Sequence, residues 1–249
     1  MNSVIDPAVA RAELIKLRTI PSTWWFLGVT SAAALTISGL VGGMGDAGDI
    51  GIIDAMIGPS FSLLLIMILA ARAATQEFQT NVIWASYLAV PNWPRLISTR
   101  AATLATVSAV VGAAICAGSL LVVAIVAPDA DLVPDTSVEW RALWGLVLAY
   151  AISAVIGMSV GIVIKSGGLA TSLLLVWSLA GEPALGPLSD WLLGSDLSPW
   201  LPFTAMAVII GDSDAAAIPG GIAVGVFYVM ALACALLAFA TAVQRRRQL

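Results

Sequence analysis

Long runs of apolar residues, each about the length needed to cross a membrane, dominate this chain. A transmembrane helix needs about 20 predominantly apolar residues. Five runs meet this requirement directly, and a sixth begins at Gly168 but contains the helix-breaking stretch GEPALGP. Only 10% of the residues are charged, against about 25% in an ordinary globular domain. We therefore predict an all-α integral membrane protein, one transmembrane domain over residues 1–249, with spans at 24–44, 53–74, 101–126, 140–164, 168–193 and 222–243.

Charged residues are distributed unevenly between the two sets of loops that six spans create. If both chain ends lie on one side of the membrane, that side contains ten of the 11 basic residues, and Arg141 is the exception. Only three acidic residues fall on the same side, namely Asp6, Glu13 and Glu77. Cytoplasmic segments of membrane proteins carry an excess of Lys and Arg. The sequence therefore predicts a multi-pass protein of the plasma (inner) membrane with both termini in the cytoplasm.

The segment between the fifth and sixth spans is apolar but repeatedly interrupted by glycine and proline. These interruptions are Gly181, Pro183, Gly186, Pro187, Pro199 and Pro202. Such residues break helices, and at membrane depth they are tolerated only where protein or water surrounds them. We expect residues 181–218 to form an external, re-entrant segment of short helices before the last span, acting as a lid.

Several residue types that support chemistry are missing. The chain has no histidine, which excludes a Ser–His pair, H-E-x-x-H zinc chemistry and histidine-ligated haem. Its two lysines, Lys16 and Lys165, do not end a G-x-x-x-x-G-K loop, so no ATP site of that type is predicted. The centres of the predicted spans carry no ionisable group of the kind that ion-coupled transporters place there. Glu182 is the one partial exception, and the neighbouring glycine and proline indicate that it lies at the outer end of the fifth span. We expect no catalytic residue, metal, bound cofactor or nucleic-acid partner, which leaves a permease energised by another protein or a passive structural protein.

The polar stretch EFQTNVIWASYLAVPNWPRLISTR, residues 77–100, separates two of the apolar runs. Its first part can form a helix that Pro91 ends, with Ile83, Trp84 and Tyr87 on a broad apolar face. A helix lying on anionic lipid often has a basic polar face, but residues 80–92 contain no Lys or Arg. The face suits a groove in a partner protein, and an ordinary juxtamembrane helix explains it equally well. We expect Glu77 near the start of this helix, where the helix dipole favours a carboxylate.

This stretch resembles the loop between the first two membrane hairpins of ABC-2 type transporter permeases. That loop commonly reads E-[FY]-R-x-G-T-I-R-x-x-L-x-x-x-P-x-R-x-R before a Lys, and Arg100 stands in place of the Lys. The residues that match without gaps are Glu77, Phe78, Ile83, Pro91 and Arg95. The N-terminal AELIKLRTIPSTWW is similar to the family's E-x-x-K-L-R-[ST] segment, through Glu13, Lys16, Leu17, Arg18 and Thr19. The chain departs from the pattern at Gln79, Val82 and Trp84.

The resemblance implies a mechanism and partners. In that family, two permease subunits, identical or paralogous, pair in the lipid membrane and rest on cytoplasmic ATP-binding cassette subunits that hold ATP and Mg. The segment around Glu13, Lys16, Leu17 and Arg18 is then an interfacial helix. A coupling helix at residues 77–91 contacts the ATPase through Glu77, Phe78, Ile83, Trp84, Tyr87 and Pro91, with Arg95 following it. The complex exports an apolar or amphipathic compound, such as a drug, antibiotic, peptide or lipid.

The family also places its transport path along the second and fifth spans. The candidates there are Phe61, Ser62, Met67, Ser172 and Trp177. Phe and Met in a span usually serve packing, whereas a tryptophan in mid-span is unusual because this residue normally lies at the membrane interface. Two other functions remain open from the sequence, namely a passive membrane scaffold or assembly protein and an ATP-independent channel or carrier.

Overall fold

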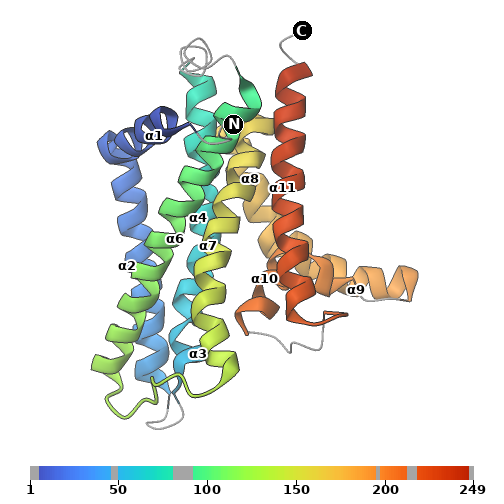
Figure 1. Ribbon diagram of the computed structural model, residues 1–249. Coiled ribbons are helices and arrows are strands. Elements are labelled where there is room, and N and C mark those ends of the chain that lie inside the picture. The colour runs from blue at the N-terminus through green and yellow to red at the C-terminus, as the bar shows by residue number, and fades with distance from the viewer. Residues whose placement is uncertain (1–5, 46–49, 81–91, 195–196, 212–217, 247–249) are drawn as a thin grey trace.

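The computed structural model describes residues 6–45, 50–80, 92–194, 197–211 and 218–246, and within these ranges the chain is helical, with no strand (Figure 1). Among these residues, six stretches are long and apolar enough to cross a membrane. The helices are α1 (Pro7–Thr19), α2 (Pro21–Met44), α3 (Ile52–Ala55), α4 (Ile57–Gln79), α6 (Trp93–Val126), α7 (Ser137–Ile164), α8 (Gly167–Val176), α9 (Glu182–Leu193), α10 (Pro202–Ile210) and α11 (Ile222–Arg246). The fold class predicted from the apolar runs is confirmed at this level, an all-helical protein with six candidate spans.

Helix α1 lies across one end of a bundle formed by the long helices (Figure 1). Asp6 caps it by accepting a hydrogen bond from the Ala8 backbone N–H at 3.0 Å, and Pro7 occupies its first turn. Pro21 then starts α2, because proline fits the first turn of a helix but cannot continue one. The chain therefore turns sharply between α1 and α2, which separates a crosswise helix from a span.

The centre of the bundle is the packing of α4 against α7. The spans Ile52–Gln79 and Ser137–Ile164 are 56% and 61% buried over their apolar windows, against 17–28% for the other four. Gly157 and Gly161 make the close approach possible, because a Cβ atom on Gly157 would lie 2.0 Å from the Met67 carbonyl oxygen and one on Gly161 would lie 2.4 Å from that of Ala71. Small residues four apart allow this kind of backbone contact between membrane helices.

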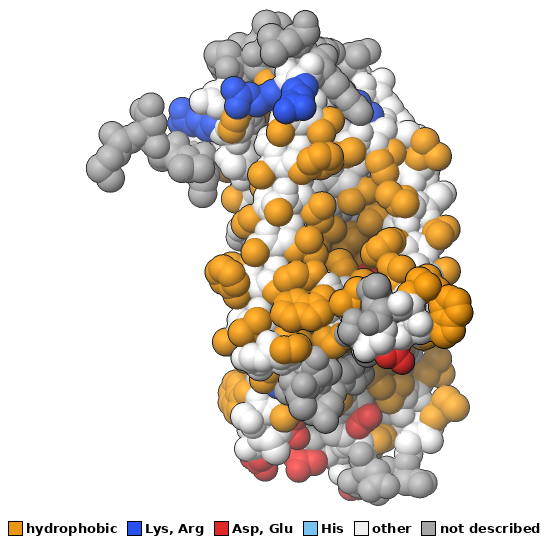
Figure 2. Space-filling model, turned by 90° about the vertical axis from the view of Figure 1, so that its right-hand side faces the viewer, with side chains coloured by type: hydrophobic (Ala, Val, Ile, Leu, Met, Phe, Trp, Pro, Cys, Tyr) orange, Lys and Arg blue, Asp and Glu red, His pale blue; other side chains and the backbone are white. Residues whose placement is uncertain are grey.

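Opposite ends of the bundle carry opposite charges. Figure 2 shows Lys and Arg side chains gathered at the upper end, Asp and Glu side chains mainly at the lower end, and a hydrophobic surface between them. We call the upper end, where α1 lies and α11 finishes, the basic end, and the lower end, where α3 lies, the acidic end (Figure 1). An apolar band between two polar ends is the surface expected of a membrane-spanning protein.

The fifth candidate span, Gly167–Leu192, and the region after it are divided into short helical segments. A π-helical turn, η1 (Trp177–Gly181), joins α8 to α9, and a single 3₁₀ turn, η2 (Ser198–Trp200), precedes α10. Figure 1 shows α9 projecting sideways from the bundle. Pro199 and Pro202 each lie in the first turn of an element, where proline starts a helix instead of breaking it. Contrary to the sequence-based expectation, Pro183 and Pro187 lie within a continuous helical run from residue 167 to residue 193 and do not interrupt it.

Candidate functional site

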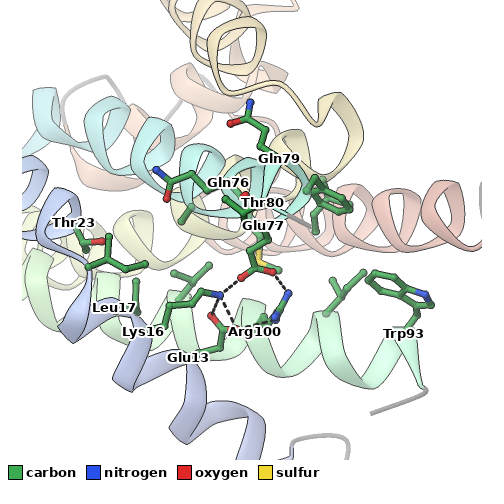
Figure 3. Close-up of a pocket in the computed structure, with 18 residues that line it drawn as sticks. Glu13, Lys16, Leu17, Thr23, Gln76, Glu77, Gln79, Thr80, Trp93 and Arg100 are labelled. Atoms are coloured by element: carbon green, nitrogen blue, oxygen red, sulfur yellow. Dashed lines mark hydrogen bonds and ion pairs between the residues drawn. The ribbon is translucent and has the colours of Figure 1, made fainter. Parts of the chain in front are cut away.

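Four charged side chains from three helices meet at the basic end. Glu13 and Lys16 come from α1, Glu77 from α4 and Arg100 from α6 (Figure 3). The Lys16 ammonium contacts Glu13 at 3.2 Å and also pairs with Glu77. The Arg100 guanidinium contacts Glu13 through Nε at 2.8 Å and also pairs with Glu77. Each carboxylate therefore faces both cations, and we call these four residues the ion cluster.

The ion cluster is largely shielded from water. Glu13, Glu77 and Arg100 are 7%, 7% and 6% exposed, and Lys16 is less buried. Removing charges from water is costly unless opposite charges and hydrogen bonds compensate them, and here two carboxylates are balanced by two cations. Burial is the largest influence on Lys16 and lowers the pKa of its ammonium, while neighbouring Glu13 acts in the opposite direction. The cluster is a neutral, buried link between α1, α4 and α6.

The position of Glu77 differs from the sequence-based expectation. Glu77 lies in the last turn of α4, which ends at Gln79, and not at the start of a separate helix. A carboxylate at a helix C-terminus faces the unfavourable end of the helix dipole. Lys16 and Arg100 compensate for this placement, which explains why two cations converge on one carboxylate.

A second set of contacts fixes the start of α1 on α6. The Arg95 guanidinium forms an ion pair with Asp6 at 3.2 Å. The Asp6 backbone N–H also donates to the Thr99 hydroxyl at 3.0 Å. At the other end of α1, the Trp24 indole N–H donates to the Arg18 carbonyl oxygen at 2.9 Å. Helix α1 is therefore held to the bundle at its start, its middle and its end.

A cavity of about 550 Å³ adjoins the ion cluster. Its walls come from α1, α2, α4, α6 and α7, and they include Leu17, Phe78, Trp93, Ile97 and Met158 besides the four charged residues (Figure 3). Phe78 also lies under the Lys165 ammonium, 5.0 Å from the ring centroid. The cavity thus combines an apolar lining with a balanced group of charges at one edge.

The structure brings together part of the predicted coupling and interfacial residues. Glu13, Lys16, Leu17, Glu77 and Phe78 surround the same cavity, whereas Arg95 lies beside them as the partner of Asp6 and Arg18 is exposed. The remaining coupling residues, Ile83, Trp84, Tyr87 and Pro91, lie outside the described residues.

The predicted path residues do not form one surface. Ser62 and Met67 are buried in the bundle, and the Ser62 hydroxyl donates to the Pro59 carbonyl oxygen at 2.8 Å and bonds the Tyr150 hydroxyl. Phe61, Ser172 and Trp177 are at the surface of the chain. Helical spacing could not separate these groups, because it does not show which side of an almost wholly apolar helix faces its neighbours.

The roles of two buried ionisable residues in the structure were not recognised from sequence. Arg100 appeared only as a substitution in the loop motif, yet it pairs with both carboxylates of the ion cluster. Glu182 appeared only as a residue near the end of the fifth span, yet its buried carboxylate accepts hydrogen bonds from three other residues. The available signal was the rarity of ionisable residues in apolar surroundings, which favours a specific role.

Comparison with protein-family models gives no match for this chain, and comparison with curated proteins gives none either. The motifs in the sequence and the geometry of the ion cluster are therefore the basis on which a function is assigned.

Proposed function

We propose that this protein is the membrane-spanning permease subunit of an ABC-2 type exporter, driven by ATP hydrolysed on a separate subunit. The observation that carries the proposal is the ion cluster. The ion cluster joins helix α1 to the start of the 77–100 stretch, which resembles the ABC-2 loop. Glu13 and Lys16 belong to the N-terminal motif of that resemblance, and Glu77 belongs to the loop motif. A passive scaffold has no evident need for a buried polar link between these two segments.

The proposed orientation puts the basic end in the cytoplasm. Nine of the ten described Lys and Arg residues belong to that end, with Arg141 as the exception, and positive charge favours the cytoplasmic side. Both chain ends, α1 and the segment after Gln79 then face the ATP-binding subunits in the plasma membrane. ATP and Mg bind to those subunits, and this chain supplies no catalytic residue.

In the proposed mechanism, the ion cluster transmits movement from the ATPase into the spans. A push on the segment after Gln79 acts directly on the last turn of α4, because that turn carries Glu77 and Phe78. Helix α4 packs backbone-to-backbone on α7, so the two helices move together as a rigid unit. Such rigid-body movement of one subunit against a second copy or a paralogue alternates access to a path between them.

The proposed path follows the exposed members of the predicted set. Phe61, Ser172 and Trp177 are available to a substrate or a second subunit, whereas Ser62 and Met67 are enclosed within this chain. The cargo is an apolar or amphipathic compound, in keeping with surfaces that offer aromatic and small polar side chains.

The decisive experiment changes Tyr87, the predicted anchor for the ATPase. An aromatic anchor at the centre of an interface often dominates its affinity, and an aspartate there leaves an uncompensated charge, which costs several kcal/mol in a desolvated contact. Tagged protein is purified from its native host in mild detergent, and the co-purified Walker-motif protein and Mg-dependent ATP hydrolysis are measured. Tyr87→Asp is expected to remove both, while the six-span protein still inserts.

The matched control is Trp191→Asp, which places the same charge on an aromatic residue that is 80% exposed on α9. It is expected to retain the ATPase. If the unaltered protein purifies with no ATP hydrolysis and no Walker-motif protein, the proposal fails and an ATP-independent carrier or scaffold is favoured. If Tyr87→Asp keeps its ATPase, the stretch after Gln79 is an ordinary juxtamembrane segment.

A further inference from the structure

Helix α10 is short yet buried along most of its length. Ala205, Met206, Val208, Ile209 and Ile210 are each less than 5% exposed. In Figure 1 it lies in the lower half of the molecule, beside α7 and α11. Gly145 of α7 permits a close approach, because a Cβ atom there would lie 3.1 Å from the Ile209 carbonyl oxygen. A helix of nine residues has too little backbone to be stable by itself, so its position depends on what holds it.

A buried carboxylate binds the start of α10. Glu182, the first residue of α9, is 4% exposed. It accepts hydrogen bonds from the backbone N–H groups of Phe203 at 2.9 Å and Thr204 at 3.0 Å, and from the Thr204 hydroxyl at 3.3 Å. These N–H groups belong to the first turn, which has no acceptors within its own helix. The residue before α10, Leu201, provides no side-chain cap, so a residue about 20 positions earlier in the chain does so.

The same carboxylate also fixes the π-helical turn that precedes it. The Trp177 indole N–H donates to Glu182 Oε1 at 3.0 Å. Glu182 therefore joins the fifth candidate span to α10 through one side chain. This contact gives the indole N–H of Trp177 a buried acceptor, although the ring itself is partly exposed.

A buried cation lies at the opposite end of α10. Arg141 of α7 is 7% exposed, and its Nη2 atom lies 3.4 Å from the place of a Cβ atom on Gly211, the left-handed residue that ends α10. The carbonyl end of a helix favours a positive charge, as its N–H end favours a negative one. Both ends of α10 thus have the charge that its dipole prefers. The placement also explains why Arg141 departs from the charge pattern of the loops, since it serves a helix end inside the protein.

We propose that Glu182 and Arg141 are a pair of positioning residues that hold α10 in its buried position. When these contacts are lost, the whole of α10 leaves this position as one unit. The two residues come from different elements, the start of α9 and the second turn of α7. A displacement of α9 relative to α7 therefore pulls the two charges apart along the axis of α10 and loosens both ends together. The position of α10 is therefore set by the relative position of α9 and α7, and this inference does not depend on the proposed transport function.

The test is hydrogen–deuterium exchange of the purified chain in lipid nanodiscs, read at individual amides of α10. Glu182→Leu removes the acceptor, and the loss of a helix cap corresponds to about two- to thirty-fold faster exchange at Phe203 and Thr204. Because α10 moves as one unit, the amides of residues 205–210 are expected to accelerate by a similar factor. Glu182→Gln, which keeps one acceptor oxygen, is expected to give a smaller effect.

The reciprocal variant is Arg141→Met, which should accelerate exchange at the first turn of α10 as well as the last, with partial recovery in Arg141→Lys. Asp190→Asn, an exposed acid-to-amide change on α9, is the control and should leave α10 unchanged. Acceleration confined to Phe203 and Thr204 would show a local cap only and overturn the proposal. Acceleration spread over α4 and α7 would also overturn it, because the charges would then support the fold as a whole.

Discussion

At the scale of single residues, the buried ionised groups in the described part of the chain lie beside opposite charges or helix ends. Glu77 is the clearest case, because it lies at the carbonyl end of α4 and still is buried. The two cations around it come from helices that precede and follow α4 in the chain. Removing one partner of a buried ion pair is strongly destabilising, because it leaves an uncompensated charge out of contact with water.

Loss of one charge from the ion cluster should therefore destabilise the protein, and loss of a complementary pair should cost less than the two single losses combined. We expect Glu77→Gln and Arg100→Met each to lower stability by about 3–5 kcal/mol, the usual cost of an uncompensated buried charge. The double variant restores neutrality and should recover part of that loss. The measurement is the midpoint of thermal unfolding in detergent, compared across the four proteins of the cycle.

Arg245→Met is the control for this cycle, since Arg245 is an exposed residue in the last turn of α11. Its midpoint should remain within error of the unaltered protein. Equal effects of Arg100→Met and Arg245→Met, or simple additivity of the two cluster variants, would contradict a cooperative buried cluster.

At the scale of helices, the sequence predicted the number and approximate position of the spans but not their full lengths. The predicted third span begins at residue 101, while α6 begins at Trp93. Likewise, α4 continues to Gln79, beyond the predicted end at residue 74. An apolar run indicates which part of a helix contacts lipid, whereas the helix itself extends until a cap or a proline ends its backbone hydrogen bonds. At the start of α6, Asn92 is that cap and Pro94 lies in the first turn. The ion cluster depends on these polar extensions, so hydropathy alone could not reveal it.

The contact between α4 and α7 makes a sharp prediction at the same scale. Gly157→Ala should disrupt this contact, because the new methyl group meets the Met67 carbonyl oxygen at 2.0 Å and forces the helices apart. Overpacking of this kind costs about 1–3 kcal/mol. The unfolding midpoint should fall accordingly.

Gly168→Ala is the matched comparison on α8, where a Cβ atom meets nothing within 4 Å. Alanine is the better helix former, so this variant should be as stable as the unaltered protein or slightly more stable. A Gly157→Ala protein that unfolds at the same temperature as Gly168→Ala would show that α4 and α7 can separate freely.

At the scale of the whole molecule, the separation of basic and acidic ends is the strongest statement about orientation. The first of the six candidate spans, α2, starts at the basic end, and the last, α11, finishes at the same end (Figure 1). An even number of crossings therefore agrees with the placement of both chain ends on one side. The acidic end carries the only described basic residue that departs from the pattern, Arg141, and it is buried.

Orientation can be measured with two exposed positions at opposite ends of the bundle. Single cysteines are introduced at Gln79 and at Val133, which is 64% exposed, in a background that lacks Cys116 and Cys234. On intact cells, a membrane-impermeant maleimide should label Val133→Cys and spare Gln79→Cys, because the proposed orientation places the basic end in the cytoplasm. Permeabilised cells should label both, and the reverse result on intact cells would invert the orientation.

The ion cluster also has a consequence for the order in which the chain is made. Proteins emerge from the ribosome from the N-terminus onward, so Glu13 and Lys16 are present before Glu77, and Arg100 appears 23 residues later than Glu77. Until Arg100 arrives, the partly made assembly has two carboxylates and one ammonium. Arg100, near the start of the third candidate span, then supplies the second cation and makes the cluster neutral. The helices that carry Glu13, Lys16 and Glu77 can therefore reach their final packing only after the start of that span has been synthesised.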